Sequence, residues 1–402
     1  MNILLLLLLS LPSVLGIKVP LSTKGANVVD NTGVPIKLHC TSWSGFHMED
    51  YLAFGLEYQT VDNIIKLINE GGFNCVKMQF STEIVYYDPV VNSKLLVDHN
   101  NNLIGMTGIE IFTYIINKLT KSGLMVILDY HILDAKWCCD PFDENGLWYN
   151  DRWSENTVIL QLLKVVRLLK NNSLVVGVDI RNEIRPSLKL LNITVSGKRI
   201  IDFSKSEYPN WGKGGKNDWA SAAERFGDAV HSVNDKLLII VQGIFVLGLQ
   251  EIIIYLNGNT PKFPQSLRGV IYRPINLKVP NKVVYSAHSY SWNYNINWNS
   301  EDSWEHFNKQ SDYNWGFIKK DLNLPLFIGE FGTGHNVSEL YFQYITRYIK
   351  ENNLDWAYWS LEGNQNRKKP ADINWFGLLD VNYTTFAYKP MLRSLQDLMK
   401  LN

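Results

Sequence analysis

Short apolar runs rich in β-branched residues alternate along the chain with longer stretches in which apolar residues recur every three or four positions. The short runs have the length of buried parallel strands, and the longer stretches have the period of amphipathic helices. Eight strands are predicted, at Ile36–Trp43, Phe73–Phe80, Met125–His131, Val175–Asn182, Leu237–Gln242, Lys282–His288, Leu326–Glu330 and Asp355–Ser360. Helices are predicted at Val61–Glu70, Gly108–Ser122, Glu155–Leu169, Trp219–Val233, Glu339–Lys350 and Tyr388–Leu401, with a further one near Gly248–Tyr255.

The order of these elements predicts the fold class. A strand, a crossover and a parallel strand, repeated eight times, indicate an α/β fold of the (β/α)8 TIM barrel type in one domain. An N-terminal hairpin precedes the barrel, with strands around a turn at Asp30–Gly33. Two longer connections interrupt the alternation, at Ser187–Asn217 and Asn257–Asn281. The first follows the fourth strand directly and is therefore expected to rim the active face.

The first sixteen residues are typical of a secretory signal peptide. An apolar run precedes a proline and a small residue, so we expect cleavage after Gly16 and a mature domain of residues 17–402. The run is about half as long as the roughly 20 residues of a membrane span, so no membrane association is expected. Four glycosylation sequons also fit a secreted protein, at Asn171, Asn192, Asn336 and Asn382. A lysosome-like compartment is the alternative location.

The four cysteines allow at most two disulfides, which is too few for a disulfide-based scaffold. Cys138 and Cys139 are not expected to pair with each other, because the eight-membered ring would strain the peptide between them. The four cysteines also lack the two closely spaced pairs of a structural zinc site. Their pairing stays open at this stage.

Charge and composition narrow the class of partner. The 39 basic and 39 acidic side chains give no net charge, which argues against nucleic acid or anionic membranes as partners and suits neutral substrates. The chain contains 13 Trp, more than a core alone requires. Exposed tryptophans form platforms on which sugar rings stack, although some of these residues must belong to the core.

Two apolar runs end on a glutamate. Glu183 follows the fourth predicted strand and Glu330 ends the seventh, so both are expected at the carboxyl ends of barrel strands. A strand-end glutamate is often only part of an ion pair or a helix cap, but two of them suggest a catalytic pair. Hydrolysis of an acetal needs two carboxylates, one to donate a proton and one to meet the developing positive charge. The sequence therefore predicts a sugar-cleaving enzyme.

Other strand ends carry matching motifs: Asp129-Tyr130-His131, Arg181-Asn182-Glu183, His288-Ser289-Tyr290 and Trp359-Ser360. In this order, from about Leu21 to about Leu401, the chain resembles clan A glycoside hydrolases of family 5, the cellulase family. Three phrases are similar to its eukaryotic, plant-like branch: Gly72-Phe73-Asn74-Cys75-Val76, Trp137-Cys138-Cys139 and Arg181-Asn182-Glu183. A fourth, Leu147-Trp148-Tyr149, is similar to bacterial endoglucanases.

The resemblance implies a role for each residue. Glu183 would be the acid/base and Glu330 the nucleophile of a retaining enzyme, with Tyr290 fixing the orientation of Glu330. Asn182 would hold the sugar 2-hydroxyl and Trp359 would form the floor of the central subsite. The two histidines, His131 and His288, would contact sugar hydroxyls or the acid/base, although a strand-end histidine is more often structural.

Lys77 departs from the family pattern, which has an arginine on the second strand beneath the nucleophile. A lysine keeps the positive charge but lacks the forked hydrogen bonding of a guanidinium. We therefore expect Lys77 to face Glu330, with weaker activity or a slightly different subsite as the consequence.

The sequence as a whole predicts a secreted, monomeric enzyme that hydrolyses internal β-1,4-glucan bonds in a polysaccharide or oligosaccharide. Mannan, another β-glucan or a glycolipid glycan are alternative substrates, since the same carboxylates serve all of them. A catalytically silent carbohydrate-binding barrel is the alternative from another class. A metalloenzyme is a third hypothesis, but the chain has no His-Glu-x-x-His motif, so neither a metal nor a cofactor is predicted.

Overall fold

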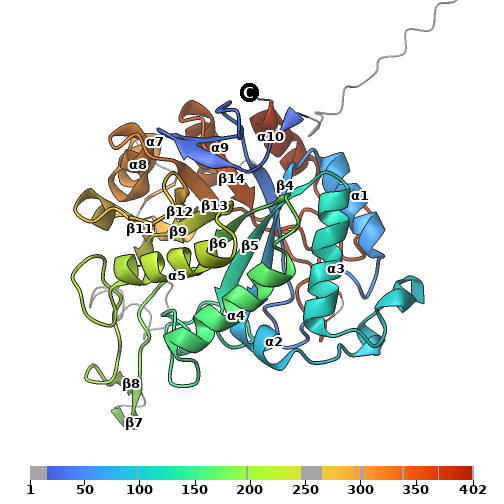
Figure 1. The fold of residues 1–402 in the computed structure, drawn as a ribbon, viewed down its shortest axis with the longest axis horizontal. Helices are drawn as coiled ribbons and strands as arrows, with labels where there is room; N and C mark the ends of the chain where they lie inside the picture. Colours follow the sequence, from blue (N-terminus) through green and yellow to red (C-terminus); the bar gives the residue numbers. More distant parts are fainter. Residues whose placement is uncertain are drawn as a thin grey trace, which may run out of the picture.

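The centre of the molecule is a closed barrel of eight parallel strands (Figure 1). The computed structural model describes residues 16–96, 98–195, 198–245, 265–294, 296–298, 303–336, 339–369 and 371–400. The barrel strands are β3 (His39–Trp43), β4 (Cys75–Ser81), β5 (Met125–Ile132), β6 (Val175–Asp179), β9 (Leu238–Gln242), β12 (Val283–Ser289), β13 (Leu326–Phe331) and β14 (Asp355–Tyr358). All eight predicted strands and the predicted TIM barrel are confirmed.

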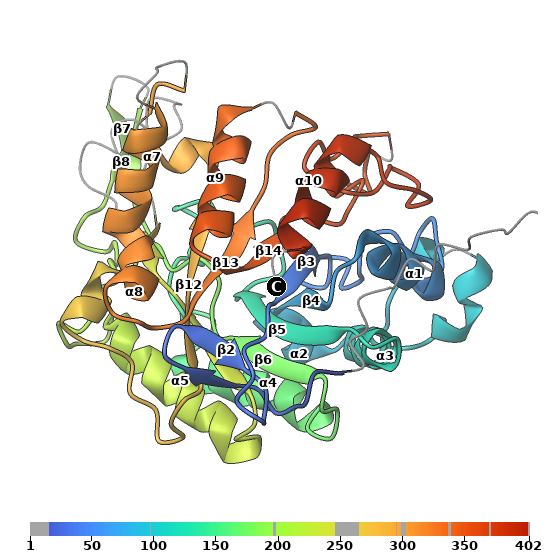
Figure 2. The same cartoon turned by 90° about the horizontal axis from the view of Figure 1, so that it is seen from above.

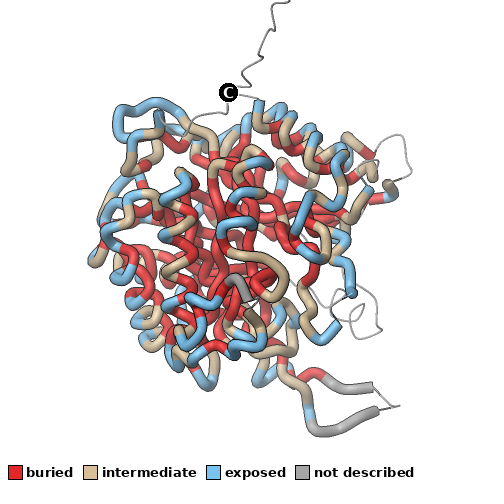
Figure 3. Tube along the Cα trace, turned by 90° about the vertical axis from the view of Figure 1, so that its right-hand side faces the viewer, coloured by how far each residue is buried: buried red, intermediate tan, exposed pale blue. Residues whose placement is uncertain are grey.

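Six predicted helices are confirmed and cover the outside of the barrel: α1 (Val61–Gly71), α3 (Gly108–Lys121), α4 (Glu155–Leu168), α5 (Trp219–Val233), α9 (Leu340–Glu351) and α10 (Lys389–Met399). Figure 3 shows buried residues along the central strands and exposed residues on the outer turns. Shorter elements were not predicted: α2 (Thr82–Tyr87), α7 (Ser303–Ser311), α8 (Phe317–Lys320), the π-turn η6 (Asp312–Gly316), and the 3-10 turns η2 (Ser93–Leu95), η3 (Asp98–Leu103), η4 (Arg268–Ile271) and η5 (Ser291–Asn293). The helix predicted near Gly248–Tyr255 lies outside the described residues.

Two small antiparallel pairs lie on the loops: β7 (Leu190–Val195) with β8 (Lys198–Ile201), and β10 (Ile244–Phe245) with β11 (Gln265–Ser266). The first pair belongs to the long connection after the fourth barrel strand. Figure 1 shows it projecting from the barrel.

The N-terminal hairpin differs in part from the prediction. Its paired strands are β1 (Ser22–Lys24) and β2 (Asn27–Val29), joined through Gly25, which has the left-handed backbone that glycine adopts easily. The predicted turn is also present, because the Gly33 N–H donates to the Asp30 carbonyl at 3.0 Å. However, it closes only a single bridge, between Val29 and Pro35. Figure 1 shows the hairpin (blue) at the end of the molecule away from β7 and β8, and Figure 2 shows it beside the barrel strands.

The barrel interior is layered. The layer that packs on the N-terminal hairpin is apolar and joins side chains of the hairpin to inward-facing residues of all eight strands, among them Leu21, Val28, Cys40, Ile127 and Phe327. Because strand side chains alternate, a step of two residues along a strand keeps the inward direction and moves one layer toward its carboxyl end. Cys75 is followed in this way by Lys77, and Ile127 by Asp129.

The cysteines form two disulfides. Cys40 and Cys75 link β3 to β4, with Cα atoms 4.3 Å apart, inside the apolar layer. Cys138 pairs with Cys139, so the expectation that these neighbours do not pair is wrong. The peptide bond between them is cis, and their Cα atoms are 3.2 Å apart.

Three features bear on secretion. The predicted signal peptide, apart from Gly16, lies outside the described residues. Asn171, Asn336 and Asn382, three of the four predicted glycosylation sites, are exposed. Among the described residues, none of the helices has the length and apolar character needed to cross a bilayer.

Arg181 ties the connection after β5 to the end of β6. It is fully buried, and its guanidinium donates to four backbone carbonyls: those of His131 (2.5 Å), Asn182 (2.8 Å), Leu147 (3.0 and 3.1 Å) and Asn145. The His131 carbonyl lies near the end of β5, and the other three lie on the loops that follow β5 and β6. Arg181 therefore holds in place the two loops that frame Glu183.

Replacing Arg181 with methionine should destabilise the protein strongly. The substitution keeps the apolar stem but leaves several buried carbonyls without a donor, so the free energy of unfolding should fall by about 3 kcal/mol or more. Urea denaturation followed by tryptophan fluorescence measures this change. Arg393, which is exposed on α10, provides the matched control. Its replacement with methionine should change the free energy by less than about 0.5 kcal/mol, and an equal loss in both variants would contradict the role of Arg181.

Candidate active site

The two candidate glutamates meet at the carboxyl ends of the barrel strands. Glu330 lies within β13, and Glu183 lies on the loop that follows β6, where its backbone has a positive φ of 45°. Both line a cavity of about 440 Å³. The other lining residues are His47, His131, Trp137, Cys138, Cys139, Pro141, Asn182, Arg185, Leu188, Phe245, Tyr290, Trp292, Asn293, Trp359, Gln365, Asn374 and Phe376.

His288 bridges the two carboxylates from below. Its Nδ1 lies 3.0 Å from Oε1 of Glu183 and 3.5 Å from Oε2 of Glu330. One oxygen of each glutamate and this nitrogen all lie within 4.8 Å of one another. Burial lowers the pKa of His288, which favours the neutral imidazole. Other groups must therefore offset the repulsion between the two carboxylates.

Glu330 is held by a hydrogen bond and a cation. The Tyr290 hydroxyl donates to Oε2 at 3.1 Å, and the Lys77 ammonium lies 3.5 Å from Oε1. Burial raises the pKa of Glu330 to about 7, against the opposing effects of His288 and Lys77. Both contacts stabilise the ionised form, so Glu330 is the carboxylate of the pair that is best suited to carry the negative charge.

Lys77 lies at the centre of a buried charge cluster. Its side chain is fully inaccessible, and its Nζ is 3.1 Å from Asp179, 3.3 Å from Asp129 and 3.5 Å from Glu330. Burial disfavours the ammonium, but the attraction of the three carboxylates is larger and raises the pKa of Lys77. The expectation that Lys77 faces Glu330 is met, and its two aspartate partners come from the strands β5 and β6.

Glu183 has a different environment. Its backbone N–H donates to Oε1 of Gln242 at 2.9 Å, which fixes the loop, while its carboxylate contacts His288. Burial raises the pKa of Glu183, and the nearby Arg185 and Lys77 offset only part of this effect. Among the contacts described, His288 makes the one hydrogen bond to its carboxylate, at 3.0 Å, and no lysine or arginine pairs with it as Lys77 pairs with Glu330. Glu183 is thus the better proton carrier of the two.

His131 and Asn182 form the wall next to Glu183. Nδ1 of His131 contacts Asp129 at 3.0 Å, and its ring stacks on Trp359 with a centroid distance of 6.0 Å. Burial, with Lys77 and Arg181 nearby, lowers the pKa of His131 well below its usual value, so the ring is neutral. The Asn182 amide oxygen accepts from Gln242 at 3.3 Å, which orients the side chain toward the cavity.

The structure brings all eight predicted site residues together around this cavity, but in two tiers. Asn182, Glu183, Tyr290, Glu330, His131 and Trp359 line the cavity. Lys77 and His288 lie beneath it and do not belong to its wall: His288 contacts Glu183, which is one of the two contacts expected for it, and Lys77 contacts Glu330. Both contact the glutamates from below the cavity.

Sequence analysis missed several residues of the site. Gln242 ends a predicted strand and contacts Asp179 at 2.7 Å, so its place at a strand end was an available signal. His47 lies after the first strand, buried, with its ring 4.7 Å from that of His131. The exposed Trp137 and Trp292 extend the aromatic lining. Trp137 belongs to the phrase Trp137-Cys138-Cys139 that the sequence analysis noted, whereas nothing in the local sequence of His47 or Trp292 distinguishes them from ordinary loop residues.

Two clusters of three side chains, each with a histidine and two carboxylates, have the composition of a metal site. Ligand atoms of Asp129, His131 and Glu330 lie within 4.8 Å of one another, as do those of Glu183, His288 and Glu330. However, the Lys77 ammonium already contacts Asp129 and Glu330 and supplies a positive charge there. A metal ion at either cluster would therefore lie beside this ammonium and compete with it for Glu330.

Comparison with known proteins places the chain in a family. Residues 29–365 match the model of the cellulase family, glycosyl hydrolase family 5. A glycosyl hydrolase 5 family protein from Chamaecyparis obtusa is 28% identical, over 90% of this chain and 61% of that protein, so the chain spans about three fifths of the relative's length. An endoglucanase from Paenibacillus polymyxa is also 28% identical, over 85% of this chain and 79% of the relative.

Solved structures agree with this placement. A hyperthermophilic endocellulase from Pyrococcus horikoshii superposes with a TM-score of 0.75 and 25% identity, covering 94% of this chain and 98% of that one. The catalytic domain of the major endoglucanase from Xanthomonas campestris, at 22% identity and a TM-score of 0.75, shares the fold. Because the family model covers most of the chain, this protein belongs to the cellulase family, glycosyl hydrolase family 5.

Proposed function

We propose that this protein is a secreted, retaining endo-β-glycosidase that hydrolyses internal β-1,4-glucan bonds. The observation that carries the proposal is the pair Glu183 and Glu330, whose oxygens lie within 4.8 Å of each other across His288. Retaining glycosidases place their two carboxyl groups about 5 Å apart, whereas inverting enzymes leave room for a water molecule between them. The short separation supports the retaining mechanism.

In the first step Glu330 attacks the anomeric carbon while Glu183 donates its proton to the departing glycosidic oxygen. The contacts of Glu330 with Tyr290 and Lys77 keep its charge available for this attack. Burial raises the pKa of Glu183, so this group is still protonated when the glycosidic oxygen departs. The product of the step is a glycosyl ester on Glu330.

In the second step Glu183, now ionised, takes a proton from water, and the resulting hydroxide displaces Glu330 from the sugar. Each displacement inverts the anomeric carbon, so two displacements restore the β configuration. Asn182 faces the cavity beside Glu183 and is suited to bind the sugar 2-hydroxyl, whose hydrogen bond strengthens in the transition state.

Aromatic residues support a β-glycan as substrate. Trp359, Trp137 and Trp292 present rings to the cavity, together with Phe245 and Phe376. The flat faces of equatorially substituted sugar rings stack on such platforms. The endoglucanases and endocellulases among the relatives support internal cleavage of a β-1,4-glucan. The predicted signal peptide and the exposed Asn171, Asn336 and Asn382 support secretion.

A panel of soluble polymers tests this function. Carboxymethyl cellulose should lose viscosity faster than reducing ends accumulate, which is the sign of internal cleavage, and β-mannan should be cut more slowly. Proton NMR of the earliest products should show the β-anomer first. Release of α-anomers would contradict the retaining mechanism, and no reducing ends from any β-glycan would favour a silent carbohydrate-binding barrel.

Azide rescue distinguishes the two glutamates. Glu183→Ala should lose activity on polysaccharide by about 10²-fold or more, and azide should restore turnover of an activated aryl glycoside as the β-glycosyl azide. Glu330→Ala should be rescued by azide as the α-glycosyl azide, because the small anion then occupies the place of the nucleophile. Chromatography and NMR identify the anomers. If Glu183→Ala gave the α-glycosyl azide and Glu330→Ala the β-glycosyl azide, the roles of the two glutamates would be exchanged.

Replacing Lys77 should shift the acidic limb of the pH profile. Without its positive charge the pKa of Glu330 rises further, so Lys77→Met should lose activity at a higher pH than the wild type as the solution is acidified. The maximal kcat/KM should fall by roughly 10- to 1000-fold.

Lys77→Arg is the matched control, since it keeps the charge and should leave the acidic limb in place. Circular dichroism confirms that both variants are folded. An unchanged pH profile in folded Lys77→Met would show that Lys77 does not control the charge of Glu330.

A further inference from the structure

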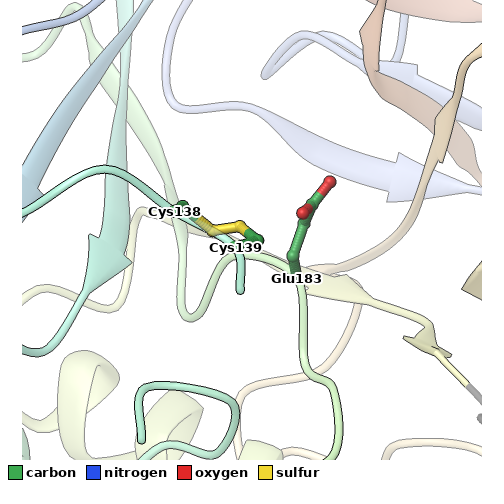
Figure 4. A group of neighbouring side chains, drawn as sticks. All are labelled: Cys138, Cys139 and Glu183. Atoms are coloured by element: carbon green, nitrogen blue, oxygen red, sulfur yellow. A yellow bond between two sulfur atoms is a disulfide. The ribbon is translucent and has the colours of Figure 1, made fainter. Parts of the chain in front are cut away.

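The Cys138–Cys139 disulfide is part of the active-site wall, and the mechanism leaves it without a role. Both residues line the same cavity as the two glutamates. Their sulfur atoms and a carboxylate oxygen of Glu183 all lie within 4.8 Å of one another. Figure 4 shows the disulfide and the Glu183 side chain on neighbouring segments at the cavity.

The two disulfides differ in accessibility. Cys40 and Cys75 are fully buried in the apolar layer of the barrel, whereas Cys138 and Cys139 are half-buried and open to the cavity. A small reductant in solution can therefore reach only the second bond without unfolding the barrel. Moreover, this bond joins adjacent residues and closes no long loop, so its loss removes little of the chain-entropy stabilisation that a disulfide provides.

The surroundings favour the reduced sulfurs as ligands. Nη1 of Arg185 lies 3.7 Å from Sγ of Cys138, and Nδ2 of Asn182 lies 3.9 Å from the same atom. A nearby guanidinium and amide stabilise a thiolate, which is the form that binds metal. Arg185 is itself anchored by Asp143 at 2.7 Å, so the cation is fixed in position.

We propose that Cys138, Cys139 and Glu183 form a latent site for a thiophilic divalent cation, such as Zn²⁺ or Cd²⁺, which becomes available when the disulfide is reduced. Two thiolates and one carboxylate supply three of the four positions of a tetrahedral site, with water in the fourth. With bonds of about 2.3 Å, the two sulfurs of a tetrahedral site lie about 3.7 Å apart, so they must separate once the disulfide is broken, while the Glu183 oxygen must approach them by about 1 Å. The half-buried side chains leave room for this movement.

The chemistry balances with a phosphine as the reductant. Two electrons from the phosphine break the sulfur–sulfur bond, the oxygen of a water molecule ends on the phosphine oxide, and its two protons end on the two sulfurs. The cation then replaces both thiol protons. The next expectation rests on the proposed function of Glu183. A cation bound to the Glu183 carboxylate takes the place of its proton, so hydrolysis should stop.

Cadmium uptake tests the site independently of activity. The wild-type protein is reduced with a water-soluble phosphine, freed of reductant by gel filtration without oxygen, and titrated with Cd²⁺. One cadmium ion per chain should bind, with the ultraviolet absorption of a cadmium–thiolate bond, whereas the unreduced protein should show no such band. Equal binding before and after reduction would overturn the proposal, whether or not the protein hydrolyses glycans.

Variants assign the ligands. The double variant Cys138→Ser/Cys139→Ser should show no cadmium–thiolate band after reduction. Glu183→Gln should bind cadmium more weakly, by about tenfold or more, because one ligand loses its charge. Reduced wild-type protein whose thiols are capped with iodoacetamide serves as a second control if the double variant does not fold. Mass spectrometry should locate the caps on Cys138 and Cys139 and not on Cys40 or Cys75. Undiminished uptake in either control would place the cation elsewhere and contradict the site.

Activity gives the last comparison. Saturating cadmium should lower the rate of the reduced wild type on polysaccharide by about 10²-fold or more, as expected for loss of a general acid. It should leave the rate of the unreduced protein unchanged. Uptake without inhibition would confirm the cation site but overturn the inference that it withdraws Glu183 from the reaction.

Discussion

The ammonium of Lys77, buried among three carboxylates, is the interaction on which the site depends. Moving a charge out of water costs several kcal/mol, and the cost is recovered only where opposite charges lie at close range and in fixed positions. Asp129, Asp179 and Glu330 meet that condition at 3.1 to 3.5 Å, each from a different strand. The cluster exists only when the barrel is closed, because no two of these residues are near each other in the sequence.

The layering of the barrel explains why the charges lie at this height. Residues two positions apart on a strand face the same way, so the apolar Cys75, Ile127 and Ile240 lie directly below Lys77, Asp129 and Gln242. The apolar layer excludes water from below, and the cavity admits substrate from above. The charged layer between them is therefore dry enough for a single ammonium to influence the ionisation of Glu330.

Much of this arrangement follows from local sequence patterns. All eight strands were predictable because each is a short run rich in β-branched or aromatic residues between stretches of helical periodicity, and Glu183 and Glu330 were identified because they end two of these runs. The contacts of Lys77 with two aspartates were not predictable, since strand register and barrel closure decide them. The Cys138–Cys139 pairing was missed because ring geometry depends on the backbone conformation, which the residue types alone do not indicate.

The two glutamates differ in how they are held, and the difference suits the roles proposed for them. Glu330 belongs to a barrel strand, its side chain is 6% exposed, and a tyrosine and a lysine fix its oxygens. Glu183 lies on a loop beyond its strand, its side chain is 16% exposed, and only His288 contacts its carboxylate directly among the described hydrogen bonds. A nucleophile must hold one position and one charge through the reaction. An acid/base must release a proton and recover one from water, so it needs the greater access that the loop provides.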